Sequence, residues 1–212
     1  GKAVLCEKPL AMNGLEVSQM IDCAKKNNRF LMEAMWTYFF PAMVEVRRII
    51  SIGDIGQIRL VNANFCFNRE PDPEGRLINP LLGGGALLDI GVYVIAFAQM
   101  IYGKEPQNIS SNAHICATGV DEQCSMIFSY PGGSLASLNC SFSVDSPCHA
   151  AVYVTKGYIR IPHMFFHPDT FSVKIGELPE KEYSFNRLGN GYTYQALEVM
   201  QCLRDGKLQS QI

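Results

Sequence analysis

Two short apolar runs, separated by a segment with helical spacing, open the chain. The runs cover residues 3–6 and 30–35, and both have the length of buried strands. Between them, from Asn13 to Asn28, apolar residues recur at the spacing of an amphipathic helix: Val17, Met20, Ile21 and Ala24. Asn13 suits the N-cap because Glu16 follows three residues later. Strand, helix and strand in this order predict a parallel, right-handed βαβ unit, which would close a doubly wound sheet.

A second helix and a longer strand follow. Pro41 is expected at the first helical position, and the helix is expected to run to about Ile52 and to stop at residues 53–56, Gly-Asp-Ile-Gly. Residues 57–68 alternate between apolar and polar positions, which predicts a strand. Residues 69–82 have the composition of a loop.

From residue 107 onward the apolar period changes to two. Turn signals separate four predicted strands: 108–118, 122–130, 135–144 and 149–155. Three shorter strands continue the pattern: 158–161, 171–175 and 182–185. Consecutive hairpins predict an antiparallel meander with strand 57–68 beside it. A last helix is predicted over residues 191–204.

This change of period predicts two kinds of structure in one chain. Residues 1–40 predict the end of a doubly wound α/β domain. Residues 41–212 predict an α+β domain whose mainly antiparallel, open-faced sheet carries helices on one face. An exposed apolar surface on the other face would favour a homodimer. Because the chain opens without methionine directly into a strand, we interpret it as a fragment lacking both termini.

Charge and cysteine usage exclude several classes of protein. A net charge of −2 and a pI near 6.1 give no basic footprint for nucleic acid. The most apolar stretch, residues 92–102, is shorter than the ~18–20 residues that span a bilayer. Eight dispersed cysteines without a Cys-x-x-Cys pair are typical of buried thiols in a reducing compartment. We therefore expect a cytoplasmic protein without membrane association. No metal site is expected either, since prolines flank His163 and His167.

Lys8 is the first candidate site residue. The strand over residues 3–6 delivers Glu7, Lys8 and Pro9 at its C-terminal end, which is where open α/β sheets bind their ligands. Pro9 disfavours helical backbone at Lys8 and would hold it at the strand's edge. The alternative is an ordinary strand end with a solvated lysine.

Four aromatic residues follow the second predicted strand. Residues 36–41 read Trp-Thr-Tyr-Phe-Phe-Pro and contain the chain's one tryptophan. Such a cluster at a C-terminal strand edge forms either part of the core or a wall over a flat ligand.

A glycine-rich segment carries the second candidate. Gly83-Gly84-Gly85 precede a predicted helix with Asp89 and Tyr93 four residues apart, and therefore on one helical face. The glycines permit close backbone approach and are expected to leave N–H groups for a ligand. Asp89 and Tyr93 would act either as an oriented acid/base pair or as partners in buried hydrogen bonds. The segment follows a loop and not a strand, so it is not a dinucleotide phosphate fingerprint.

These motifs occur together with Glu33-Ala34-Met35-Trp36-Thr37. The combination resembles the glucose–fructose oxidoreductase / inositol dehydrogenase family of nicotinamide-dependent enzymes, over nearly the whole chain. Most members have histidine where this chain has Tyr93. Tyrosine there, with the segment 31–37, resembles the dimeric subgroup that oxidises trans-dihydrodiols and D-xylose with NADP.

The resemblance implies a role for each motif. Residues 1–40 would be the C-terminal part of a dinucleotide-binding Rossmann domain, and residues 41–212 the substrate and dimerisation domain. Lys8 would donate to the reacting oxygen and to the nicotinamide ribose, beside a cis Pro9. Tyr93 would be the general acid/base and Asp89 its companion.

The resemblance also implies binding residues. Glu7, Lys8, Pro9 and Trp36 would contact the cofactor, while Trp36 and Phe185 would line the substrate pocket. NADP is the cofactor that the resemblance implies, although the residues that choose NADP over NAD would lie upstream of Gly1.

The chain departs from the subgroup's pattern in two places. Tyr38 stands where arginine is expected, and residues 114–117 replace basic residues expected before Thr118-Gly119-Val120-Asp121. Either change could weaken binding of cofactor phosphate or substrate. Two alternatives therefore stay open: a sugar or inositol dehydrogenase that does not handle aromatic diols, and a catalytically silent relative.

Overall fold

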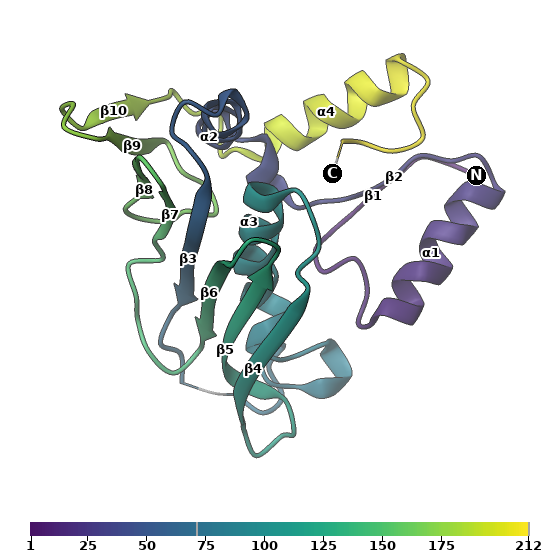
Figure 1. Cartoon of the computed structure of the whole chain (residues 1–212). Helices are drawn as coiled ribbons and strands as arrows, with labels where there is room; N and C mark the ends of the chain where they lie inside the picture. The colour runs from purple at the N-terminus through teal and green to yellow at the C-terminus, as the bar shows by residue number, and fades with distance from the viewer. Residues whose placement is uncertain (71, 212) are drawn as a thin grey trace. The chain divides into compact units, whose positions relative to one another are not determined.

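The computed structural model describes residues 1–70 and 72–211, which form two units (Figure 1). Unit 1 comprises Gly1–Phe40 and the segment that begins at Arg187, and unit 2 comprises Pro41–Asn186. The predicted division of the chain also falls after residue 40. The predicted second domain continued to residue 212, whereas unit 2 ends at Asn186.

Unit 1 contains the predicted βαβ unit. β1 (Val4–Cys6) pairs in parallel with β2 (Leu31–Glu33), and α1 (Gly14–Lys26) connects them. The predicted N-cap is confirmed, because Asn13 Oδ1 accepts the N–H of Glu16 at 3.0 Å. The predicted apolar stripe of α1 is half-buried: Val17, Met20, Ile21 and Ala24.

The last helix belongs to unit 1 because its apolar side completes that unit's core. α4 (Tyr192–Arg204) contributes Cys202 to a cluster with Phe30, Met32 and Phe39. After α4 the chain returns to β2, where the N–H of Leu31 donates to the carbonyl of residue 208 at 3.2 Å. Local periodicity predicts such a helix but does not show against which sheet it packs.

Unit 2 is built on one eight-stranded sheet with helices packed on one face, which confirms the predicted fold class (Figure 1). Its elements in chain order are α2 (Pro41–Ile52), β3 (Ile58–Cys66), α3 (Val92–Tyr102), β4 (Asn108–Ile115), β5 (Asp121–Tyr130), β6 (Ser134–Ser141), β7 (Ala150–Val154), β8 (Gly157–Ile161), β9 (Thr170–Ile175) and β10 (Lys181–Ser184).

The predicted meander is wrong at its centre. The strand order is β10-β9-β8-β7-β3-β6-β5-β4, so β3 lies between β6 and β7 and pairs in parallel with β6. Val61, Ala63 and Phe65 of β3 are all buried, which is compatible with a strand in the middle of the sheet. Turn signals between β6 and β7 predict that the chain reverses, but not that the returning strand pairs with its predecessor.

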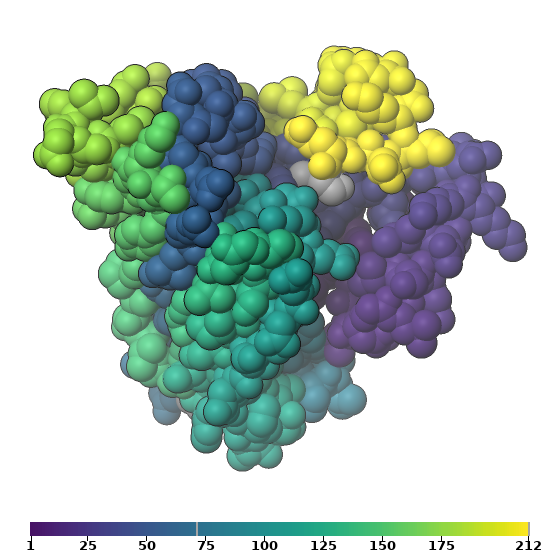
Figure 2. Space-filling model, viewed as in Figure 1, coloured from purple at the N-terminus to yellow at the C-terminus, as the bar shows by residue number. Residues whose placement is uncertain are grey.

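The two faces of the central strands differ in composition. Buried side chains such as Ala136, Leu138 and Cys140 of β6 face α3, which lies behind the sheet in Figure 1. On the opposite side the strands lie at the surface (Figure 2), and polar residues such as Asn62 and Asn139 alternate with the buried ones. We refer to this side as the open face.

One run among the described residues is long and apolar enough to cross a membrane. It covers Pro80–Tyr102, 23 residues, and 50% of its most apolar window is buried inside the protein. The expectation that no run reaches this length is therefore wrong, because it considered residues 92–102 alone. By length and composition this is weak evidence for a span, since a buried core helix passes the same test.

Candidate functional site

The glycine-rich segment begins the site of unit 2. The N–H groups of Gly83, Gly84 and Gly85 donate to backbone carbonyls of residues 77–80 at 2.8 to 3.3 Å. The expectation that these amides point to a ligand is therefore wrong. The loop before the helix folds back on itself and uses them internally, which is why close backbone approach is needed here: a Cβ on Gly84 would lie 2.7 Å from the backbone N of Asn79.

The helix that carries Asp89 and Tyr93 begins with an irregular turn. Leu87–Gly91 is a π-helical turn, which continues directly into α3. Single π turns inside helices occur frequently at functional sites. Apolar spacing does not reveal such a turn, so the sequence predicted a plain helix.

Asp89 forms an ion pair with a loop residue. Arg76 Nη1 lies 2.9 Å from Asp89 Oδ1, and the Asp89 side chain is 12% exposed while that of Arg76 is 67% exposed. The carboxylate is thus largely shielded but keeps a positive partner. Sequence reasoning missed Arg76, because nothing in a loop of mixed composition marks one arginine as a partner.

Tyr93 lies in an aromatic cluster of unit 2. Its ring is buried, with centroids 5.4 Å from Phe65 on β3 and 5.6 Å from Phe166. Phe65 and Phe166 stack on each other at 4.2 Å. This packing fixes the orientation of the phenol, as acid/base chemistry requires. Phe166 was not predicted, since it lies between strands.

Unit 1 contains the lysine motif. The Lys8–Pro9 peptide bond is cis, as the resemblance implied, and Lys8 is half-buried immediately after β1 while Glu7 is exposed. At the C-terminal end of β2, Glu33 Oε1 accepts the N–H of Leu10 at 2.9 Å. Burial raises the pKa of Glu33, whereas the Leu10 N–H and the nearby Lys8 ammonium lower it. The two parallel strand ends thus bring Lys8 and Glu33 together.

Trp36 is covered within unit 1. Tyr192, in the first turn of α4, stacks on its indole at 4.3 Å and 15°, and Phe40 packs edge-on at 5.2 Å. Tyr192 is 48% exposed whereas Trp36 is 8% exposed. Of the two stacked rings, Tyr192 is therefore the one that faces solvent. Sequence reasoning missed this residue because it lies more than 150 positions from Trp36.

Phe185 belongs to unit 2, whereas Trp36 belongs to unit 1. It follows β10 in unit 2 and stacks on Phe171 with centroids 6.1 Å apart. The predicted residues thus fall into sets: Lys8, Pro9 and Trp36 in unit 1, and Asp89, Tyr93 and Phe185 in unit 2. Each unit orders its own set.

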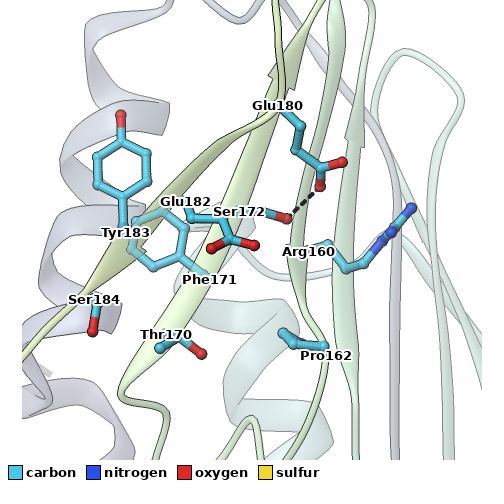
Figure 3. Close-up of a pocket in the computed structure, with 9 residues that line it drawn as sticks. All are labelled: Arg160, Pro162, Thr170, Phe171, Ser172, Glu180, Glu182, Tyr183 and Ser184. Carbon is cyan, nitrogen blue, oxygen red and sulfur yellow. Dashed lines mark hydrogen bonds between the residues drawn. The ribbon is translucent and has the colours of Figure 1, made fainter.

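A separate hollow of about 370 Å³ lies over the outer strands β8, β9 and β10 (Figure 3). Two of its polar groups are engaged with each other, since Glu180 accepts a hydrogen bond from Ser172, and Glu180 also accepts one from Tyr158. None of the predicted site residues lines it. Among the described residues, no group of three or more His, Cys, Asp or Glu side chains is placed to bind a metal. The helix with Asp89 and Tyr93 and the lysine motif therefore remain the candidate site.

Comparison with known proteins places this geometry in a family. Residues 43–160 match the GFO/IDH/MocA C-terminal domain. The trans-1,2-dihydrobenzene-1,2-diol dehydrogenase of Xenopus tropicalis is 39% identical over 219 residues, which cover 100% of this chain and 66% of that protein. The same enzyme of Mus musculus is 40% identical over 220 residues, covering 100% and 65%.

A solved structure shows the same fold. The aldose-aldose oxidoreductase of Caulobacter crescentus superimposes with a TM-score of 0.86 at 24% identity, over 97% of this chain and 63% of that one. The chain spans just under two thirds of the length of the curated relatives that it matches. On the family match, which covers more than half of the chain, and on the relatives' identity along its whole length, the chain belongs to the GFO/IDH/MocA family.

Proposed function

We propose that this chain is part of an NADP-dependent oxidoreductase that removes a hydride from a hydroxyl-bearing carbon of a trans-dihydrodiol or a D-xylose-like sugar. The observation that carries the proposal is the 39–40% identity to dihydrodiol dehydrogenases along the whole chain. Lys8, Asp89 and Tyr93 are the residues of this chain to which the resemblance assigns the chemistry. The choice of NADP and of these substrates rests on the same resemblance.

Tyr93 is proposed as the general base for the alcohol. As hydride leaves the carbon, a nearby group must take the hydroxyl proton. A phenol with an ordinary pKa near 10 does this poorly at neutral pH, and a neighbouring ammonium favours its ionised form. In the proposed mechanism Lys8 supplies that ammonium and also donates a hydrogen bond to the substrate oxygen, where negative charge develops.

Asp89 and Arg76 are proposed to hold this arrangement. The ion pair between them, with N and O 2.9 Å apart, ties the π-helical turn to the preceding loop. The carboxylate therefore helps to keep the turn that leads into Tyr93 in one position. Phe65 and Phe166 restrict the ring of Tyr93 in the same way.

Unit 1 is proposed to be the last part of the dinucleotide-binding domain. Parallel β1 and β2 present Lys8 and Glu33 at their C-terminal ends, the edge at which such sheets bind nucleotides, so the residues present fit the cofactor. When bound, the nicotinamide would accept the hydride. Glu7, Lys8 and Pro9 would contact it, and Trp36 with Phe185 would line the substrate pocket.

The first test is turnover by the full-length protein and its Tyr93→Phe variant with NADP and either a trans-dihydrodiol or D-xylose. We expect the variant to lose more than about a hundredfold in kcat, which is within the usual contribution of a general base. Phe185→Leu serves as a control outside the proton-transfer step, and we expect it to change KM more than kcat. A variant at position 93 with wild-type kcat would contradict the proposed base.

The substrate pair separates the alternatives. Oxidation of D-xylose without oxidation of the dihydrodiol would favour a sugar or inositol dehydrogenase. Binding of dinucleotide without turnover of either compound would favour a catalytically silent relative. Parallel reactions with NAD test the choice of cofactor.

Two further properties belong to the proposal. We expect a homodimer formed through the open face of the sheet. We also expect a cytoplasmic location, which the unpaired state of the eight cysteines supports and which fractionation of cells expressing the tagged protein would test.

A further inference from the structure

Asp121 binds the beginning of the helix that carries the proposed acid/base. It is the first residue of β5, and its Oδ2 accepts the N–H of Leu87 at 2.6 Å. Leu87 is the first residue of the π-helical turn. A carboxylate at the N-terminus of a helix satisfies a donor that has no partner within the helix and interacts favourably with the helix dipole.

A β-bulge turns Asp121 toward that helix. In regular alternation Asp121 would share the open face with Gln123 and Ser125, because Cys124 and Met126 point to the helix side. The pairing of β4 with β5 shifts at this point, so that Ile115 pairs with Asp121 while His114 pairs with Gln123. A bulge of this kind re-aims a side chain. Here it moves a carboxylate from the solvent side to the helix side.

The segment before the helix leaves space for this carboxylate. Gly85 has φ +120°, and a Cβ at this position would lie 2.5 Å from Asp121 Oδ1. The absence of a side chain at residue 85 therefore lets the carboxylate reach the helix. The helix meets the sheet again at Gly91, where a Cβ would lie 3.1 Å from the Sγ of Cys140 on β6.

These contacts define two anchor points, Leu87 and Gly91, with Asp89 between them and Tyr93 two residues after the second. A π turn is less regular than an α-helix, so its own hydrogen bonds fix its position less firmly. We propose that Asp121 is a positioning residue for the proposed reaction: its carboxylate anchors the first turn of the Asp89–Tyr93 helix to β5 and so sets where the phenol stands. The expected effect on kcat rests on the proposed function, whereas the anchoring of the helix turn by Asp121 does not.

Three variants of the full-length protein test the inference: Asp121→Ala, Asp121→Asn and the matched control Glu122→Ala. Glu122 is the adjacent carboxylate, and it accepts a hydrogen bond from Ser143 Oγ and not from the helix. For Asp121→Ala we expect a loss of about 10²-fold in kcat with KM changed by less than about threefold, because a displaced catalytic group costs rate more than binding. Asp121→Asn retains an oxygen for the Leu87 N–H, and we expect it to restore kcat to within about threefold of wild type.

Amide hydrogen exchange gives a measurement that does not depend on activity. We expect Asp121→Ala to speed exchange over residues 85–93 and to leave exchange in β8 and β9 unchanged, whereas Glu122→Ala changes neither. If the wild-type protein oxidises no substrate, the proposed function fails, and exchange alone decides the anchor. Unchanged exchange over residues 85–93 in Asp121→Ala would overturn the inference, as would a kcat equal to that of Glu122→Ala in an active enzyme.

If Asp121→Ala does not fold, Asp121→Ser takes its place. The serine hydroxyl is a good helix cap but is shorter than the carboxylate, so it can reach Leu87 only if the turn moves. We expect lower kcat and faster exchange over residues 85–93 in this variant also. Wild-type values of both quantities would overturn the inference.

Discussion

Glu33 is a carboxyl group whose environment disfavours its charge. Burial raises its pKa above the ordinary value, and this outweighs the hydrogen bond from Leu10 and the attraction of Lys8. A group with a raised pKa in the folded state binds its proton more tightly there than in the unfolded chain. It therefore stabilises the fold at pH values below its unfolded pKa, and this contribution is lost as the pH rises through the folded pKa.

Glu33→Gln tests whether the contribution of Glu33 to stability falls as the pH rises. Glutamine keeps an oxygen for the Leu10 N–H but never becomes charged, so the variant should gain stability relative to wild type as the pH rises from about 4 toward 7. The measurement is the free energy of unfolding in urea at several pH values. Glu7→Gln removes an exposed carboxylate from the same unit and serves as control. A difference between Glu33→Gln and wild type that is constant over this pH range would contradict the assignment to burial.

Single residues could be proposed for the candidate site where local sequence marks them. Pro9 marks Lys8, and the glycines mark the helix that carries Asp89 and Tyr93. Arg76 and Asp121 were not recognised as parts of the site, because each meets its partner through the folding of a distant segment: Asp121 binds Leu87, and Arg76 binds Asp89. Tyr192 was not predicted as a partner of Trp36 for the same reason, since the two rings meet only when α4 packs in unit 1.

At the scale of elements, Gly91 sets how closely the Asp89–Tyr93 helix approaches β6. A Cβ at residue 91 would lie 3.0 Å from Leu87 Cδ1 and 3.1 Å from Cys140 Sγ, both inside normal contact distance. We expect Gly91→Ala to destabilise the protein by about 1–3 kcal/mol, as extra atoms in packed cores do. Thermal or urea unfolding measures the effect.

Gly14→Ala is the matched control. Gly14 is the first residue of α1, and nothing lies within 4 Å of the position of its Cβ. This substitution should be neutral or should stabilise by up to about 1 kcal/mol, since alanine favours helix. In a double variant, Cys140→Ala should relieve part of the cost of Gly91→Ala. Equal effects of Gly91→Ala and Gly14→Ala would contradict the close contact.

Helices and strands were predicted well from periodicity, but their assembly was not. The twelve residues of α2 match their prediction in full, because proline and glycine mark both ends. β3 lies between β6 and β7, so both of its edges are paired with other strands. Local alternation of apolar and polar residues does not show which strands pair with each other. The first residue of the π turn donates its N–H to Asp121 of β5, and Gly91 at its end lies close to Cys140 of β6. Both contacts are made with distant strands, so no pattern within the helix predicts them.

At the scale of the whole molecule, the open face carries a small apolar group. Leu135 and Tyr153 are each 40% exposed, and the strand register places both beside Leu60 of β3. Ile127, 42% exposed, lies diagonally across from Leu135 on β5. We refer to these four residues as the open-face patch. Polar residues such as Asn62 and Asn139 surround it, which is the pattern of an apolar centre with a polar rim.

We predict that the patch is the centre of a symmetric dimer. In a two-fold interface each substitution appears twice, so Leu135→Arg would bring two positive charges into an apolar contact. The wild-type protein should then show twice the mass of one chain in light scattering, and Leu135→Arg should show the mass of one chain at the same concentration. Ile52→Arg is the control, because Ile52 is 52% exposed at the end of α2 and lies outside the open face. A monomeric wild type would rule out the dimer, and a Leu135→Arg variant that remains dimeric like Ile52→Arg would place the interface elsewhere on the molecule.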